Sequence, residues 1–107
     1  MARAWEGLER VERQTGQPLY TVLRFRTDHP GVRSPRMADQ LSQRLGKPVT
    51  AEWVRKRLFH ARQQFTDFLL AEVARSLGQP SREELEQELV GLGLLDYCRP
   101  ALERRGG

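Results

Sequence analysis

The spacing of apolar residues predicts an all-α protein that begins with two short helices. Residues 3–13 and about 18–27 carry apolar side chains at steps of three or four, the period of a helix with one buried face. These positions are Trp5, Leu8 and Val11 in the first segment, and Leu19, Val22, Leu23 and Phe25 in the second. We expect Pro18 in the first turn of the second helix and residues 29–31 (His-Pro-Gly) at its end.

The next two predicted helices are separated by a short turn. Ser34 followed by Pro35 indicates a helix start, with the hydroxyl as N-cap and proline at the first helical position. This helix carries Met37, Ala38, Leu41 and Leu45, and it ends at Gly46. Thr50 is expected to cap a long helix that ends near Leu77. The sequence leaves open whether this helix is broken near Thr66. Its buried stripe is Val54, Leu58, Ala61, Phe65, Leu69 and Val73.

A capping box at Ser81 and Glu84 predicts another helix, which the glycines at 91 and 93 end. The tail, residues 94–104, is expected to form short helical turns on either side of Pro100. Its apolar residues should cover the stripe of the long helix near Phe68 and Leu69. These residues are Leu92, Leu94, Leu95, Tyr97 and Leu102. The chain then divides into residues 1–32, two bracing helices; 33–78, a helix-turn-helix unit; and 79–107, a helical extension.

Positive charge is concentrated in the middle of the chain. The 107 residues carry a formal net charge of +4, with a pI near 10.0. Residues 33–65 contain eight Lys and Arg against two acids, a net of +6, whereas residues 81–107 contain four Arg against six acids, a net of −2. An excess of this kind on one segment favours an anionic partner such as nucleic acid.

The long helix offers basic residues beside its apolar stripe, which suits a reader of double-stranded DNA. In a helix-turn-helix, the first turns of the second helix enter the major groove. Base edges would be read by Ala51, Glu52, Arg55 and Lys56. Phosphates would be held by Arg36, Arg44, Lys47, Thr50, Arg57, His60 and Arg62. Trp53 either stacks on DNA or packs against the turn, and packing is the favoured interpretation.

Other interpretations of these features stay open. The basic helix could be a solvated face, a docking surface for an acidic protein, or part of a dimeric helix-turn-helix regulator. The acidic residues of the run from 83 to 88 are interpreted as a solvated face, with partner docking as the alternative. The apolar tail could instead be a regulatory segment that masks the basic face or binds a partner.

The run Ala38-Asp39-Gln40-Leu41, the turn to Thr50 and the segment WVRKRLFHAR (53–62) followed by Phe65 resemble a known family. They are similar to the fourth region of bacterial RNA polymerase sigma factors of the extracytoplasmic-function type. The matching positions are Val54, Arg55, Arg57, Leu58, Ala61 and Arg62. The resemblance covers roughly residues 33–70. It implies recognition of the promoter −35 element, docking on the β flap of RNA polymerase core, and an anti-sigma-type regulator as a partner.

Two departures from the family pattern stand out. The segment LSQRLGKPVT (41–50) is about one helical turn longer than the family's connection, and Trp53 replaces a small polar residue. A counterpart of the family's second region, which melts the −10 element, is missing from this sequence. We therefore expect that this chain by itself would not initiate transcription.

The remaining chemistry points away from catalysis. Cys98 is a lone cysteine, so an internal disulfide is excluded and a cytoplasmic location is expected. No apolar run approaches the length of a membrane span, and the N-terminus lacks a signal-peptide core. His29, His60 and Cys98 lack metal-ligand spacing, and no phosphate-binding glycine loop is present. We expect no enzymatic activity, no metal and no cofactor.

Overall fold

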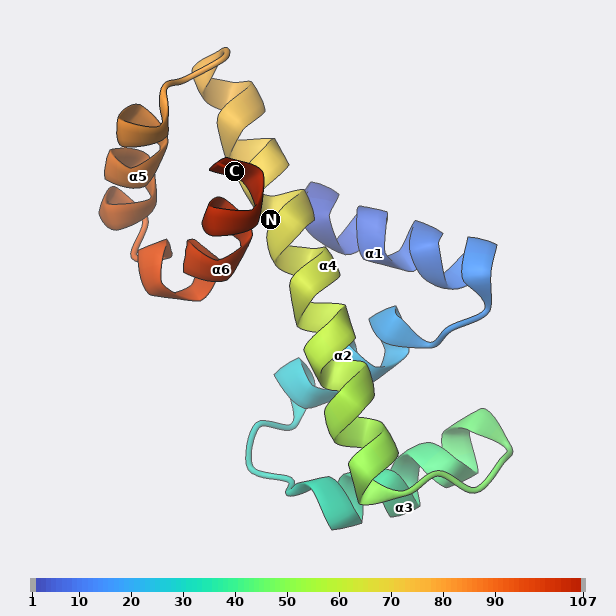
Figure 1. The fold of residues 1–107 in the computed structure, drawn as a ribbon. Helices are drawn as coiled ribbons and strands as arrows, with labels where there is room; N and C mark the ends of the chain where they lie inside the picture. Colours follow the sequence, from blue (N-terminus) through green and yellow to red (C-terminus); the bar gives the residue numbers. More distant parts are fainter. Residues whose placement is uncertain (1, 107) are drawn as a thin grey trace. The chain divides into compact units, whose positions relative to one another are not determined.

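The computed structural model describes residues 2–106 and is all-helical over that range, as the sequence predicts. Its six helices are shown in Figure 1. They are α1 (Ala2–Thr15), α2 (Leu19–Asp28), α3 (Ser34–Leu45), α4 (Ala51–Leu77), α5 (Arg82–Gly91) and α6 (Leu95–Gly106). Within residues 2–106, no helix combines the length and the apolar character needed to cross a membrane.

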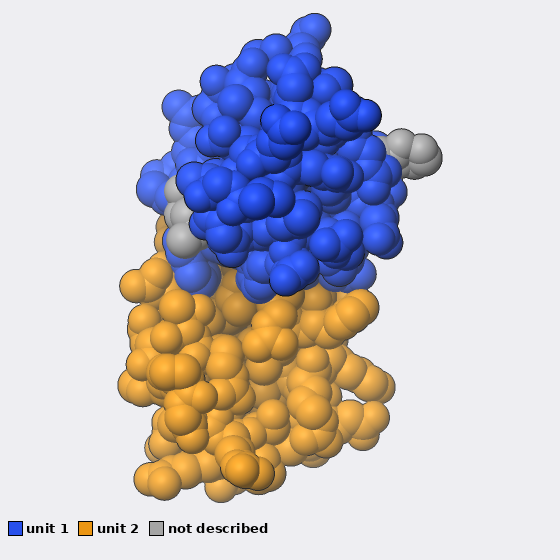
Figure 2. Space-filling model, turned by 90° about the vertical axis from the view of Figure 1, so that its left-hand side faces the viewer, with its two compact units in different colours: residues 1–7, 63–107 blue, residues 8–62 orange. Residues whose placement is uncertain are grey.

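The chain forms two compact units, coloured separately in Figure 2. One consists of residues 8–62, and the other of residues 1–7 and 63–107. The three segments expected from the sequence follow chain order, whereas these units divide α1 and α4 between them. We call them the 8–62 unit and the C-terminal unit.

The 8–62 unit buries the apolar stripes that the sequence predicts for its helices. The buried side chains include Leu8 of α1, all four predicted residues of α2, Met37, Ala38 and Leu41 of α3, and Val54, Leu58 and Ala61 of α4. The carboxylate of Glu12 links α1 to α2, because it accepts hydrogen bonds from the backbone N–H and the hydroxyl of Thr21, both at 2.9 Å. Because α1, α2, α3 and α4 all contribute to this core, the first turns of α4 are held in place within this unit.

Two helices start one residue away from their predicted positions. Pro18 is the N-cap of α2 rather than part of its first turn: its ψ of 51° is not helical, while its carbonyl accepts the first helical hydrogen bond from Val22. Likewise the N-cap of α3 is Arg33, not Ser34, because the carbonyl of Arg33 accepts from the N–H of Met37 at 2.9 Å. Ser34 is therefore already helical.

Helix α4 is continuous for 27 residues and has no break at Thr66. Thr66 is buried, and its hydroxyl donates a hydrogen bond to the Gln63 carbonyl at 3.1 Å. The helix itself thus satisfies this buried hydroxyl, so no break is needed to expose it to water.

In the C-terminal unit, α1 approaches α4 closely at Gly7. A Cβ atom at this residue would lie 2.9 Å from the ring of Phe68, so the helix–helix distance requires glycine. Two residues earlier in α1 and three residues earlier in α4, the rings of Trp5 and Phe65 are 4.7 Å apart between centroids. These aromatic contacts join residues that are about 60 positions apart in sequence.

Helix α5 begins with the predicted capping box. The Ser81 hydroxyl accepts from the Glu84 N–H at 3.2 Å, and the Glu84 carboxylate accepts from the Ser81 N–H at 3.1 Å. Leu85 and Leu89 are buried, as predicted.

The prediction that Pro100 interrupts the tail is wrong, because α6 runs through it. Proline removes one helical hydrogen bond, to the carbonyl of Asp96, which lies in the exposed first turn. Cys98, Ala101 and Leu102 on both sides of the proline are buried, so their packing keeps the helix in one piece. Burial also raises the pKa of the Cys98 thiol, which keeps it protonated and unreactive near neutral pH.

The tail covers the core with fewer residues than expected. Leu102 is buried, as the sequence predicts, and Leu94 and Leu95 are half-buried. Leu92, however, is 52% exposed. Tyr97 is 43% exposed, but the edge of its ring meets the ring of Phe65 in the α4 stripe, at 6.5 Å between centroids. The small residues Cys98 and Ala101 are buried as well as Leu102, so the buried face of α6 differs from the one that the sequence predicted for the tail.

Candidate nucleic-acid interface

Hydrogen bonds attach the connection between α3 and α4 to α3. Gly46 ends α3 with a φ of 71°, a left-handed conformation that glycine adopts at little cost. The hydroxyl of Ser42 in α3 donates to the Ala38 carbonyl at 2.7 Å and accepts from the Val49 N–H at 2.9 Å. Residues 46–50, which connect the two helices (Figure 1), are thus tied to α3 by the Ser42 hydroxyl.

Thr50 caps α4, as predicted. Its hydroxyl accepts a hydrogen bond from the N–H of Trp53 at 3.1 Å. Such a cap satisfies one of the N–H groups that the first turn of a helix leaves without a partner. The hydroxyl of Thr50, assigned from the sequence to a phosphate, has this structural role in the present conformation.

The first turns of α4 present three parallel rows of side chains outside the buried stripe. Successive residues of a helix are rotated by about 100°. Opposite the stripe of Val54, Leu58 and Ala61, the outer row consists of the exposed residues Glu52, Lys56, Phe59 and His60. Arg55 and Arg62 form a row on one side of it, which we call the arginine flank. Trp53 and Arg57 form the row on the other side, which we call the tryptophan flank.

The arginine flank borders a hollow that other elements help to form. A hollow of about 500 Å³ is lined by Arg26 of α2, Ser34 of α3, and Arg55, Leu58, Phe59 and Arg62 of α4. An adjoining hollow of about 450 Å³ is lined by Arg26, residues 30–35 and Arg55. Arg26 is positioned by a hydrogen bond of 3.2 Å to the Pro30 carbonyl. Arginines of α2 (Arg26), of the connection before α3 (Arg33) and of α4 (Arg55 and Arg62) therefore line two adjoining hollows.

On the tryptophan flank, Trp53 packs against the turn. The Lys47 ammonium lies 5.9 Å, and the Arg57 guanidinium 5.3 Å, from the centroid of the Trp53 ring. Cations over an aromatic face are attracted by its negative charge density. The ring is half-buried. It therefore holds two basic groups beside the outer row.

The other predicted site residues are more dispersed. Arg36 is exposed on α3, and Arg44 lies over the ring of Phe25, 5.3 Å from its centroid. Lys56 and Glu52 form an exposed ion pair of 3.4 Å within α4. A pair of this kind is worth little in water and can open for another partner. Ala51 is half-buried at the start of the helix.

Three residues of this surface were missed by the sequence reasoning. Arg26 lies outside the expected helix-turn-helix unit of residues 33–78, Arg33 is its first residue, and only the fold brings the two toward Arg55. Phe59 is an apolar residue off the buried stripe and is 59% exposed. Its position outside the predicted stripe was the one signal in the sequence that could have singled it out.

No protein-family model, curated protein or solved structure matches the chain. Among the described residues, no group of three or more His, Cys, Asp and Glu side chains is arranged to hold a metal ion. The interpretation of this surface therefore depends on its own geometry and charge.

Proposed function

We propose that the 8–62 unit binds double-stranded DNA, with α3 and α4 acting as a helix-turn-helix. The observation that carries this proposal is the pair of basic flanks on either side of the exposed first turns of α4. The B-DNA major groove is about 12 Å wide and admits one α-helix, and phosphates line both of its edges. A helix with cations along both sides of an outward row matches this distribution of charge.

The outer row would then face the base edges. Lys56 can donate to the O6 and N7 atoms of guanine, and Glu52 can accept from the N4 amino group of cytosine. Ala51, at the start of the helix, suits a thymine methyl group. Each of these contacts discriminates between bases, so specificity would come from the first two turns of α4.

The flanks would hold the two DNA strands by their phosphates. Arg26, Arg33, Arg55 and Arg62 serve one strand, and Lys47 and Arg57 serve the other. Arg55 was assigned to bases from the sequence, but it lies in the same row as Arg62 and borders the same hollow. We therefore propose a phosphate contact for it. Arg36 and Arg44 remain secondary phosphate candidates, and so does His60, which lies at the edge of the outer row beside the tryptophan flank.

The biological role that we propose is recognition of a promoter −35 element within a cytoplasmic sigma-type factor that acts with RNA polymerase. The support is the resemblance of residues 33–70 to the fourth region of such factors. A factor of this kind also contacts the β flap of the core enzyme and can be controlled by an anti-sigma-type regulator. These partners extend the proposal of DNA binding and depend on it.

The experiment that tests DNA binding is a titration of a labelled duplex pool at several salt concentrations, followed by fluorescence anisotropy. Six proposed phosphate contacts should give a slope of log K against log salt near −5, since each contact contributes about −0.9. A helical module that docks on an acidic protein predicts weak binding to every duplex. A slope shallower than about −2 would contradict the proposed interface.

A further inference from the structure

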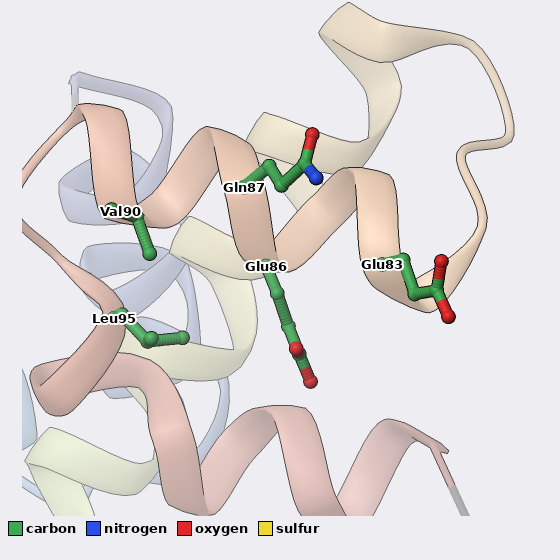
Figure 3. A pocket seen from close by; sticks show the side chains of 5 residues that line it. All are labelled: Glu83, Glu86, Gln87, Val90 and Leu95. Atoms are coloured by element: carbon green, nitrogen blue, oxygen red, sulfur yellow. The ribbon is translucent and has the colours of Figure 1, made fainter.

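A second surface, in the C-terminal unit, lies between α5 and α6 and is lined by none of the residues of the proposed DNA interface. Figure 3 shows a hollow there, lined by Glu83, Glu86, Gln87, Val90 and Leu95. Its volume is about 340 Å³, within the range of about 300 to 1,000 Å³ that ligand sites occupy. Val90 comes from the end of α5 and Leu95 from the start of α6, and both side chains project into the same space (Figure 3).

The apolar part of this hollow is unusually open to water. Val90, which lines it, is 61% exposed. Leu92, between the two helices in sequence, does not line the hollow but is also 52% exposed. The core of the unit uses the other side of α5, where Leu85 and Leu89 are buried. Aliphatic groups at Val90 and Leu92 therefore contribute little to the fold, and covering them would release apolar surface from water.

The rim of the hollow carries negative charge. Glu83 and Glu86 line it, and Figure 3 shows the Glu86 side chain projecting from α5 toward α6. Glu86 pairs with Arg82 at 3.1 Å, across a half-exposed surface where such pairs are weak. Residues 81–107 carry a net charge of −2, which repels the phosphates of a nucleic acid and attracts cations.

We propose that this hollow binds a basic amphipathic helix of another protein. One aliphatic side chain of the partner would enter between Val90 and Leu95. Lysine or arginine side chains in the neighbouring turns of the partner helix would meet Glu86 and Glu83, which lie on one side of that pair along α5 (Figure 3). Charge complementarity selects this occupant over an acidic one, and the apolar floor requires at least one aliphatic residue. This docking site goes beyond the DNA-binding proposal and stands without it.

The test uses the full chain labelled with ¹⁵N and a synthetic helical peptide. In the peptide, leucines occupy every third or fourth position on one face and lysines occupy the rest. We expect amide shifts confined to residues around 83–95. Val90→Ser should weaken binding at least about fivefold, because the apolar contact is lost. Glu83→Gln should weaken it by about twofold to threefold at low salt and flatten its salt dependence.

A matched control is Glu88→Gln, which removes an exposed charge from the same helix but not from the hollow. It should bind the peptide as tightly as the unchanged chain. The proposal is overturned by any of three results: shifts spread over other surfaces, equal binding by Val90→Ser, or a loss with Glu88→Gln as large as with Glu83→Gln. Self-association of the chain that Val90→Ser abolishes would assign the hollow to a second copy and would also overturn it.

Discussion

Replacing Arg55 and Arg62 together by alanine is expected to lower the affinity for duplex DNA about thirtyfold at about 0.1 M salt. Both arginines border one hollow on the arginine flank of α4, so two of the four proposed contacts with one DNA strand are lost. The slope of log K against log salt should fall in magnitude by about 2, because two phosphate contacts disappear. The loss should be similar for all duplex sequences, since phosphates carry no sequence information. Fluorescence anisotropy over a range of salt measures both quantities.

A matched control removes the same two charges elsewhere. The double replacement of Arg82 and Arg99 by alanine lies in the C-terminal unit and touches neither flank. It should change the affinity less than threefold. If the control weakens DNA binding as much as the flank variant, net charge explains the affinity and the proposed interface is wrong. If the flank variant instead prefers a different DNA sequence, Arg55 contacts bases, as the sequence analysis predicted, rather than phosphates.

The second large effect concerns the core under the proposed interface. Leu41 of α3 is fully buried, with an exposed fraction of 0%. Leu41→Ala is expected to lower the free energy of unfolding by about 3 kcal/mol, through lost burial and the cavity left behind. Domains of this size have only about 5–15 kcal/mol in total, so the 8–62 unit should melt well below the unchanged chain. Thermal denaturation followed by circular dichroism measures this effect.

Leu92→Ala provides the comparison, because Leu92 is 52% exposed. We expect its cost to stay below about 0.5 kcal/mol. Equal losses for the two variants would mean that Leu41 does not contribute to a packed core beside α4. In that case α3 would not support α4 in the way the proposed interface requires.

The features of this fold that the sequence predicted depend on local chemistry. The Ser81–Glu84 capping box, the Thr50 cap and the glycine end of α3 each involve residues within a few positions of one another. The stripe through Val54, Leu58 and Ala61 follows from the helical period alone. Each of these signals is complete within about one or two turns of chain, so no knowledge of the tertiary structure is needed.

The features that the sequence did not predict depend on contacts between distant residues. Pro100 remains helical because neighbouring residues of α6 are buried, and burial is decided by the rest of the C-terminal unit. Arg26 joins the arginine flank only because the fold brings α2 toward α4. The role of Trp53 depended on the path of the longer connection, which places Lys47 over its ring. The distances between these residues cannot be inferred from the pattern of residue types along the chain.

Sequence-specific DNA binding by the 8–62 unit is tested by selecting bound duplexes from a random pool with the full chain and sequencing them. Our account predicts a short, non-palindromic motif, because a single helix-turn-helix reads one site without a dimer. A palindromic motif would contradict the sigma-type role and indicate a dimeric regulator. No enrichment at moderate salt would contradict DNA reading by the 8–62 unit itself.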